Sequence, residues 1–195
     1  MSVKKLTPRG KDRRRQLMDF AAHRFAENGY HPTSVAEIVS GLGVGKGVFY
    51  WYFSSKEELM LELLREAQHD LRRRQQQAIG DEPDPVERIA LGMRASMAWF
   101  AENRHLYNLF EFARTEERFA GAMRRGQDVA VGDLVRHVKE GIVEGRMRDA
   151  DPLMLTHAIL GVTSQLAREF IHERGESGDS VADHAISFCL RGLLA

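Results

Sequence analysis

The sequence from residue 41 to residue 53 reads GLGVGKGVFYWYF, in which four glycines at alternate positions precede five consecutive aromatic residues. Such a segment can be a phosphate-binding loop or an apolar core strand. A Walker loop is excluded, because Ser40 stands in the place of its first glycine and Gly47 in the place of its hydroxyl residue. A dinucleotide-binding fingerprint is excluded too, because Lys46 replaces its third glycine and no strand pattern precedes it.

Helical patterns flank this segment on both sides. Before it, apolar residues at steps of three and four predict a first helix, which ends where Asn28 and Gly29 supply a left-handed terminus. Ser34 and Glu37 form a capping box that predicts a second helix, and a third helix spans about residues 46–52. Two helices joined by a turn with glycine, behind an earlier helix, are the layout of a helix-turn-helix DNA-binding unit.

The remainder of the chain is also predicted to be helical. A second capping box, Ser55 with Glu58, starts a long connecting helix that continues until Gly80. Asp84 and Asp151 are each followed by proline, which predicts two further helix starts. The remaining helices are expected at about residues 84–103, 105–114, 119–144, 151–174 and 180–194.

The sequence therefore predicts an all-α protein of about nine helices. We expect an N-terminal three-helix helix-turn-helix DNA-binding domain at residues 1–56 and a C-terminal helical ligand-binding and dimerisation domain at residues 57–195. The charges fit this division. Residues 1–56 hold ten Lys and Arg against four Asp and Glu, although the whole chain has a formal net charge of zero. A basic segment of this kind indicates a polyanionic partner such as nucleic acid or an anionic membrane, or else a solvated basic arm.

Within a helix-turn-helix unit the glycines have separate functions. Gly43 permits the tight turn between the two helices, and the side-chain-free positions Gly45 and Gly47 let the third helix approach a groove of DNA closely. Lys46, at the start of that helix, can reach a base edge or a phosphate.

The aromatic residues divide by helical angle. Phe49 and Phe53 face the first two helices, whereas Tyr50 and Trp51 point away from them. The hydroxyl of Tyr50 can donate to a phosphate oxygen; alternatively, Tyr50 and Trp51 pack on the connecting helix.

The segment from Arg14 to Leu64 resembles the DNA-binding domain of the TetR family of bacterial transcriptional regulators. The family pattern ends its first helix with Phe-x-x-x-Gly-Tyr and continues through Thr-Ser or Thr-Thr, Gly-Val and Lys-Gly to Ser-Lys-Glu-Glu-Leu. The matching residues are Phe25, Gly29, Tyr30, Thr33, Val35, Ile38, Gly43, Val44, Gly47, Tyr50, Phe53, Lys56 and Leu59.

This resemblance implies that Thr33, Tyr50 and Lys56 hold the DNA backbone. It also implies that the stretch Gly45, Lys46, Gly47 and Val48 faces the major groove of double-stranded operator DNA. The chain departs from the commonest pattern at Gly45, Val48 and Tyr52, where Ser, Thr and His are frequent. Direct reading of bases should therefore depend on Lys46 and on apolar contact between Val48 and a thymine methyl. The basic residues Lys4, Lys5, Arg9, Lys11, Arg13 and Arg14 either add DNA contacts or form a solvated arm.

The last two predicted helices have more apolar surface than one core face requires, and we expect them to form a four-helix interface between two copies of the chain. The predicted function is a ligand-responsive repressor that binds a palindromic operator as a homodimer and is released by a small apolar or aromatic effector. The alternative is an architectural or constitutive DNA-binding regulator without a ligand.

A ligand pocket is expected among the middle helices, where methionines and aromatic residues are concentrated. His157, which is polar within an apolar helix, is either a ligand contact or a satisfied core group. The candidate ligand-binding residues are Met97, Trp99, Phe100, Tyr107, Phe110, Met123 and His157.

Other functional classes have little support in the sequence. The eight histidines form no metal-ligand pair, and the only cysteine, Cys189, lies on an apolar stripe. We therefore expect no enzyme activity, no catalytic residues, no metal and no cofactor. No apolar run approaches the roughly 20 residues of a membrane span, so the prediction is a soluble, cytoplasmic protein without a membrane partner.

Overall fold

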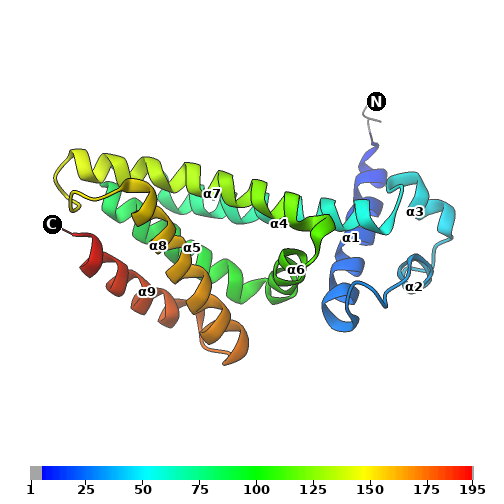
Figure 1. Cartoon of the computed structure of the whole chain (residues 1–195). Coiled ribbons are helices and arrows are strands. Elements are labelled where there is room, and N and C mark those ends of the chain that lie inside the picture. Colours follow the sequence, from blue (N-terminus) through cyan, green and yellow to red (C-terminus); the bar gives the residue numbers. More distant parts are fainter. Residues whose placement is uncertain (1–5, 195) are drawn as a thin grey trace. The chain divides into compact units, whose positions relative to one another are not determined.

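The computed structural model describes residues 6–194, and in this range the chain forms α-helices, one π-helical segment and a single isolated bridge between Met147 and Leu194. The predicted all-α class and the predicted number of helices are confirmed (Figure 1). The helices are α1 (Pro8–Asn28), α2 (Val35–Gly41), α3 (Lys46–Tyr52), α4 (Lys56–Ile79), α5 (Pro85–Glu102), α6 (Arg104–Thr115), α7 (Glu117–Val143), α8 (Pro152–Leu166), the π-helix η1 (Ala167–Glu173) and α9 (Gly178–Leu193).

The capping boxes form only in part. Ser34 accepts a hydrogen bond from the backbone N–H of Glu37 at 3.1 Å, as predicted. The carboxylate of Glu37, however, accepts from Arg24 and Asn28 at the end of α1 instead of reaching back to Ser34. A guanidinium from a neighbouring helix is a stronger partner for a carboxylate than a backbone amide, and it holds the pKa of Glu37 below its usual value. Glu37 thus joins α2 to α1 instead of completing the capping box.

The chain divides into two compact units that are not contiguous in the sequence. The first comprises the chain up to Glu66 together with His105–Ala122, and the second comprises Ala67–Arg104 and the chain from Met123 onward. The division falls within α4, because this helix is long enough to take part in both units. The single boundary between residues 56 and 57 predicted from the sequence differs from this division and stays a prediction.

The first unit is built on aromatic and aliphatic side chains of the helix-turn-helix segment. Leu17, Ile38 and Phe49 are fully buried, and Phe53 is only 2% exposed. Gly41, the last residue of α2, lies so close to α1 that a Cβ atom there would come within 2.0 Å of the Phe20 ring. The glycine therefore allows α2 to pack against α1.

The second unit is organised around the contact between α5 and α9, which lie side by side (Figure 1). Gly178 begins α9 against the backbone of α5, where a Cβ atom would stand 2.8 Å from the carbonyl oxygen of Met97. The predicted helix over residues 151–174 continues past Leu166 as a π-helix. Arg104 donates hydrogen bonds to the carbonyls of Ile171 and His172 in this segment, which supplies partners for its altered backbone.

Candidate functional site

The recognition helix α3 presents one buried and one exposed aromatic face. Phe49 is fully buried, whereas Tyr50 is 56% exposed and Trp51 is 49% exposed. Helical geometry sends Phe49 into the core of the first unit and turns its two successors outward. The predicted division of the aromatic residues is thus confirmed, and Tyr50 and Trp51 have surface available for a partner.

The glycines next to these aromatics form a surface with no side chains. Gly43 adopts φ +64°, which favours glycine and allows the turn between α2 and α3. A Cβ atom at Gly45 or Gly47 would meet nothing within 4 Å. Lys46, between these two glycines, is exposed, and Val48 is half-buried. The start of α3 is therefore an open backbone surface with one cationic side chain.

Thr33 does not present its side chain on this surface, and its predicted DNA contact stays a prediction. The residue is fully buried, and its hydroxyl donates to the carbonyl of Gly29 at 2.8 Å and lies 3.3 Å from the carbonyl of Arg24. These carbonyls belong to the end of α1, where helix geometry leaves acceptors unpaired. Thr33 therefore satisfies the terminus of α1.

Lys56 is likewise committed to the fold. Its ammonium group donates to the carbonyls of Tyr30 at 2.7 Å and Thr33 at 2.8 Å, and more weakly to that of His31 at 3.3 Å. It also lies 4.3 Å from the centroid of the Tyr30 ring. Burial lowers the pKa of Lys56, and the charge of Arg118 lowers it further. Because an ammonium has three protons and all three have acceptors, the predicted phosphate contact by Lys56 would require an existing bond to break.

Four of the basic N-terminal residues lie within α1. Thr7 caps α1, so Arg9, Lys11, Arg13 and Arg14 lie on a helix and not in a solvated arm. Arg14 forms ion pairs with Glu62 and Glu66 of α4, and its guanidinium stacks 5.2 Å from the Phe53 ring centroid. Arg9 and Lys11 are exposed and remain available to DNA. The predicted contacts of Lys4 and Lys5 lie outside the described residues.

The seven predicted ligand-binding residues are not brought together in one unit. Tyr107 and Phe110 are buried in the first unit, whereas the other five belong to the second. There, Met97 and Trp99 are fully buried, and the indole N–H of Trp99 donates to Asp70 at 2.7 Å. His157 is exposed on α8 and is therefore not a core group. None of the seven lines either of the two cavities described below.

A cavity of about 240 Å³ lies in the second unit between α4, α5, α7 and α8. Its apolar wall includes Ile89, Met93, Leu134 and Ile159. Its polar lining consists of side chains that were not predicted from the sequence. They come from separate helices, so they share no sequence pattern. These polar residues include Arg72, Gln75, Arg88, Ser96, Asp133, Arg136 and His137.

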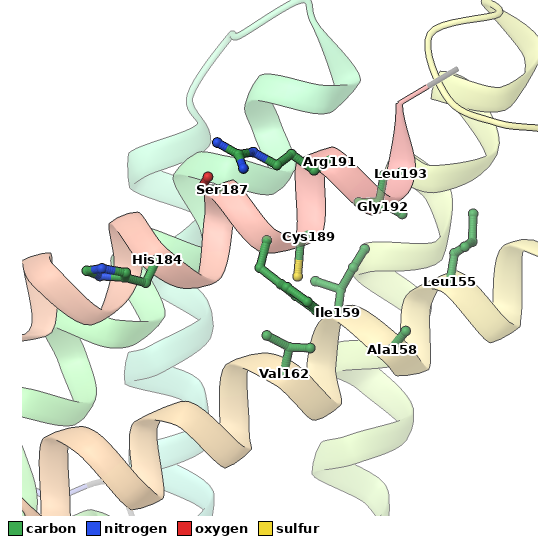
Figure 2. A pocket seen from close by; sticks show the side chains of 11 residues that line it. Leu155, Ala158, Ile159, Val162, His184, Ser187, Cys189, Arg191, Gly192 and Leu193 are labelled. Carbon is green, nitrogen blue, oxygen red and sulfur yellow. The ribbon is translucent and has the colours of Figure 1, made fainter.

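A second cavity of about 480 Å³ is an apolar groove between α8 and α9. Figure 2 shows Ile159 and Val162 of α8 on one side and Cys189 of α9 directed toward them. Phe188, which also lines this groove, is 69% exposed, and Met154 on α8 is 72% exposed. These large apolar side chains lie on the two helices for which the sequence predicted a dimer interface.

Residues 6–194 contain no group of three or more His, Cys, Asp or Glu side chains that could hold a metal ion. Cys189 is buried, and burial raises the pKa of its thiol to about 11, so the group is protonated at neutral pH and a poor nucleophile. In the same part of the chain no helix combines the length and the apolar character required to cross a bilayer.

Two family models match the chain. The model for bacterial regulatory proteins of the tetR family matches residues 17–63, and the model for the tetracyclin repressor-like C-terminal domain matches residues 82–193.

Three relatives illustrate the range of similarity. The fatty acid metabolism regulator protein of Bacillus subtilis is 31% identical over 91 residues, 47% of each chain. The transcriptional repressor KstR2 of Mycobacterium tuberculosis is 39% identical over 77 residues, 40% of this chain and 38% of the relative. The transcriptional activator FasR of Mycolicibacterium smegmatis is 28% identical over 188 residues, 93% of this chain and 83% of the relative. The matched regions thus span less than half of the first two relatives and most of the third.

The likeness to solved structures extends over the whole chain. The structure of the ketosteroid transcriptional regulator KstR2 of M. tuberculosis superposes with a TM-score of 0.75 at 25% identity, covering 100% of this chain and 97% of that one. The helix-turn-helix surface of α3 and both family matches lead to one conclusion: the chain belongs to the TetR family of DNA-binding transcriptional regulators.

Proposed function

We propose that the chain is a repressor that binds a palindromic operator in the cytoplasm as a homodimer and leaves the DNA when a small molecule binds its second unit. The observation that carries the proposal is the exposed face of α3. Lys46 and Tyr50 are accessible there, beside an open backbone at Gly45 and Gly47. An α-helix with such a face can enter the major groove, with Lys46 at base edges or phosphate and the Tyr50 hydroxyl at phosphate. Trp51 and Val48 add apolar contact area.

Dimerisation is proposed through α8 and α9. Phe188 and Met154 are large apolar side chains that one copy leaves largely in water, next to an apolar groove. In a two-fold interface the same patch meets itself, so the Phe188 of each copy can fill the groove of the other. Two recognition helices about one DNA turn apart would then read the two halves of a palindrome.

We propose that the effector binds in the cavity between α4, α5, α7 and α8. This site differs from the seven ligand-binding residues predicted from the sequence. Its apolar wall suits the small apolar or aromatic molecule that we expected. Relatives are named for fatty acid metabolism and as a ketosteroid regulator, which supports a ligand with a hydrocarbon part. Relatives are named both repressor and activator, so the sign of regulation requires measurement.

DNA binding is tested with the duplex that flanks the protein's own coding region. Lys46→Ala should weaken operator binding about 10-fold and reduce the slope of log affinity against log salt by about one, because one cation leaves the interface. The matched control is Lys139→Ala, which removes an exposed lysine of α7 and should leave affinity unchanged. Equal binding of random duplex and flanking DNA by the wild type would refute a specific regulator.

Dimerisation is tested by light scattering at micromolar concentration. Phe188→Asp should produce monomers, because it places a charge in the proposed interface. Val143→Asp is the control, since Val143 is 88% exposed at the end of α7 and lies outside the groove. A dimer that survives Phe188→Asp would place the interface elsewhere.

The alternative function, a regulator without a ligand, is favoured if no small molecule that binds the protein changes its operator affinity.

A further inference from the structure

The cavity between α4, α5, α7 and α8 is lined by two chemically different sets of side chains. One set is aliphatic: Ile89, Met93 and Ile159 are each less than 5% exposed and belong to the core of the second unit. The other set is polar and includes Arg88 of α5 and His137 of α7. A ligand that fills such a space needs a hydrocarbon part and a polar part.

Two buried nitrogens of these polar residues have no hydrogen-bond partner. These atoms are Nε of Arg88 and Nδ1 of His137. Arg88 uses Nη2 to bind Glu140 at 2.5 Å and lies 3.4 Å from the carbonyl of Pro83 with the same atom, which leaves the Nε–H unused. Buried N–H groups in folded proteins are nearly always paired, so an unpaired one next to a cavity indicates a missing acceptor.

Other polar groups of this wall already have partners. Arg72 forms a double hydrogen bond with Asp133 at 2.6 and 3.0 Å, and Arg136 binds the same carboxylate at 3.0 Å. Gln75 donates to Ser96 at 2.8 Å. Arg88 and His137 are therefore the residues of the lining that carry a buried nitrogen without a hydrogen-bond partner.

The charge of the lining favours an anion as the missing acceptor. Three arginines, Arg72, Arg88 and Arg136, line the cavity, and the carboxylates that pair with them are Asp133 in the lining and Glu140 outside it. The group therefore keeps an excess of one positive charge. Burial and the charge of Arg88 hold the pKa of His137 below its usual value, which disfavours the charged ring. In the neutral tautomer that carries its proton on Nδ1, this nitrogen is a donor. A carboxylate can accept from both nitrogens with its two oxygens.

The volume limits the size of the ligand. The cavity measures about 240 Å³, which is below the roughly 300–1,000 Å³ of sites for drug-sized ligands. We propose that this cavity binds a small amphipathic monocarboxylate, with its carboxylate on Arg88 and His137 and its hydrocarbon part along Ile89, Met93 and Ile159. The inference rests on the proposed function only in taking this cavity as the effector site.

Octanoate is a suitable probe, and 1-octanol and octylammonium are matched in chain length but neutral or cationic. Binding to the full-length protein is measured by calorimetry, below the concentration at which octanoate forms micelles. Octanoate should bind, and both other compounds should bind at least about 10-fold more weakly, since a charge-assisted hydrogen bond would be lost. Equal binding of the three compounds, or no binding of octanoate, would overturn the proposal.

The variants assign the binding to the two nitrogens. Arg88→Gln should weaken octanoate binding about 10- to 100-fold, and His137→Phe should weaken it by a smaller factor. Arg94→Gln is the matched control, because it makes the same substitution on the same helix and removes the ion pair with Asp183, which lies outside the cavity. Unchanged octanoate affinity in both cavity variants would overturn the assignment. If Arg88→Gln does not fold, His137→Phe and the three head groups still decide the matter.

Release from operator DNA is measured separately. Octanoate that binds as described but leaves operator affinity unchanged would contradict the proposed ligand-controlled regulator and leave the carboxylate site intact. The reverse result, operator release by a different compound without octanoate binding, would support the regulator and overturn the carboxylate site.

Discussion

The two compact units both contain polar groups that complete the fold, but they differ in which groups are left without a partner. In the first unit the hydroxyl of Thr33 and the ammonium of Lys56 are committed to backbone carbonyls, and Arg14 is held by two carboxylates. In the second unit the Nε of Arg88 lacks a partner, and Phe188 leaves most of its ring in water. The difference teaches where to look for function first: groups whose hydrogen bonds are already made would have to break them to bind a partner, whereas open groups would not.

The largest effect is expected in the core of the first unit. Phe49→Ala should reduce the free energy of unfolding by about 3–5 kcal/mol, because it removes a fully buried ring beneath α3. Tyr50→Ala, at the next position, should cost about 1 kcal/mol or less, because its ring is mostly exposed. Urea denaturation of both variants measures the difference. Similar losses would show that the two aromatics are not divided as described.

The role of Lys56 separates structure from DNA contact. Lys56→Met should lower the free energy of unfolding by about 1.5–3 kcal/mol, since three carbonyls lose a charged donor. The folded variant should keep its operator affinity. Lys46→Met should do the reverse, with unchanged stability and weaker binding. A large loss of operator affinity in well-folded Lys56→Met would restore the phosphate contact that the family resemblance implies.

Packing in the second unit is tested at its glycines. Gly178→Ala should destabilise the protein by about 1–3 kcal/mol, because the added methyl group meets the backbone of Met97. Gly132→Ala is the control: it lies within α7 with nothing near its Cβ position, and it should stabilise by about 0.5–1 kcal/mol. Equal effects in thermal denaturation would argue against close contact between α5 and α9.

As the pH falls, the stability that depends on His172 in the second unit should be lost before the stability that depends on the Glu37 carboxylate in the first unit. Burial lowers the pKa of His172 to about 4, with a further effect of Arg104, while an unfolded histidine has a pKa near 6.5. The unfolded chain therefore takes up the proton first, and stability present above pH 6.5 is lost progressively as the pH falls toward 4.

We expect a loss of about 1 kcal/mol between pH 6.5 and 5, reduced from the full shift because the ring is partly exposed. The hydrogen-bonded carboxylate of Glu37 stabilises only above its unfolded pKa, so its contribution is lost below about pH 4.5. His172→Gln should flatten the stability curve above pH 5. An unchanged curve would mean that His172 is not responsible.

Much of the fold follows from local sequence signals. The bounds of α3 and the starts of α2, α5 and α8 agree with the prediction, because caps, prolines and apolar spacing act over a few neighbouring residues. The split of aromatics on α3 is local as well, since it depends only on helical angle.

Interactions between residues that are far apart in the sequence could not be predicted from local sequence patterns. Glu37 was expected to cap its own helix, but Arg24 of α1 is the stronger partner. The role of Lys56 depends on three carbonyls more than 20 residues away. The cavity is lined by four helices. The unpaired nitrogens of Arg88 and His137 can be identified only when the hydrogen-bond partners of the surrounding side chains are known.

The bare start of α3 has a consequence for how this regulator can change during evolution. Neither Gly45 nor Gly47 has a positive φ, and a side chain at either position would point into open space. At Gly47, inside the helix, most replacements also favour helix formation by about 0.5–1 kcal/mol. A single substitution there can thus add a side chain without harming the fold. If α3 enters the groove as proposed, the sequence preference for DNA can change independently of folding stability.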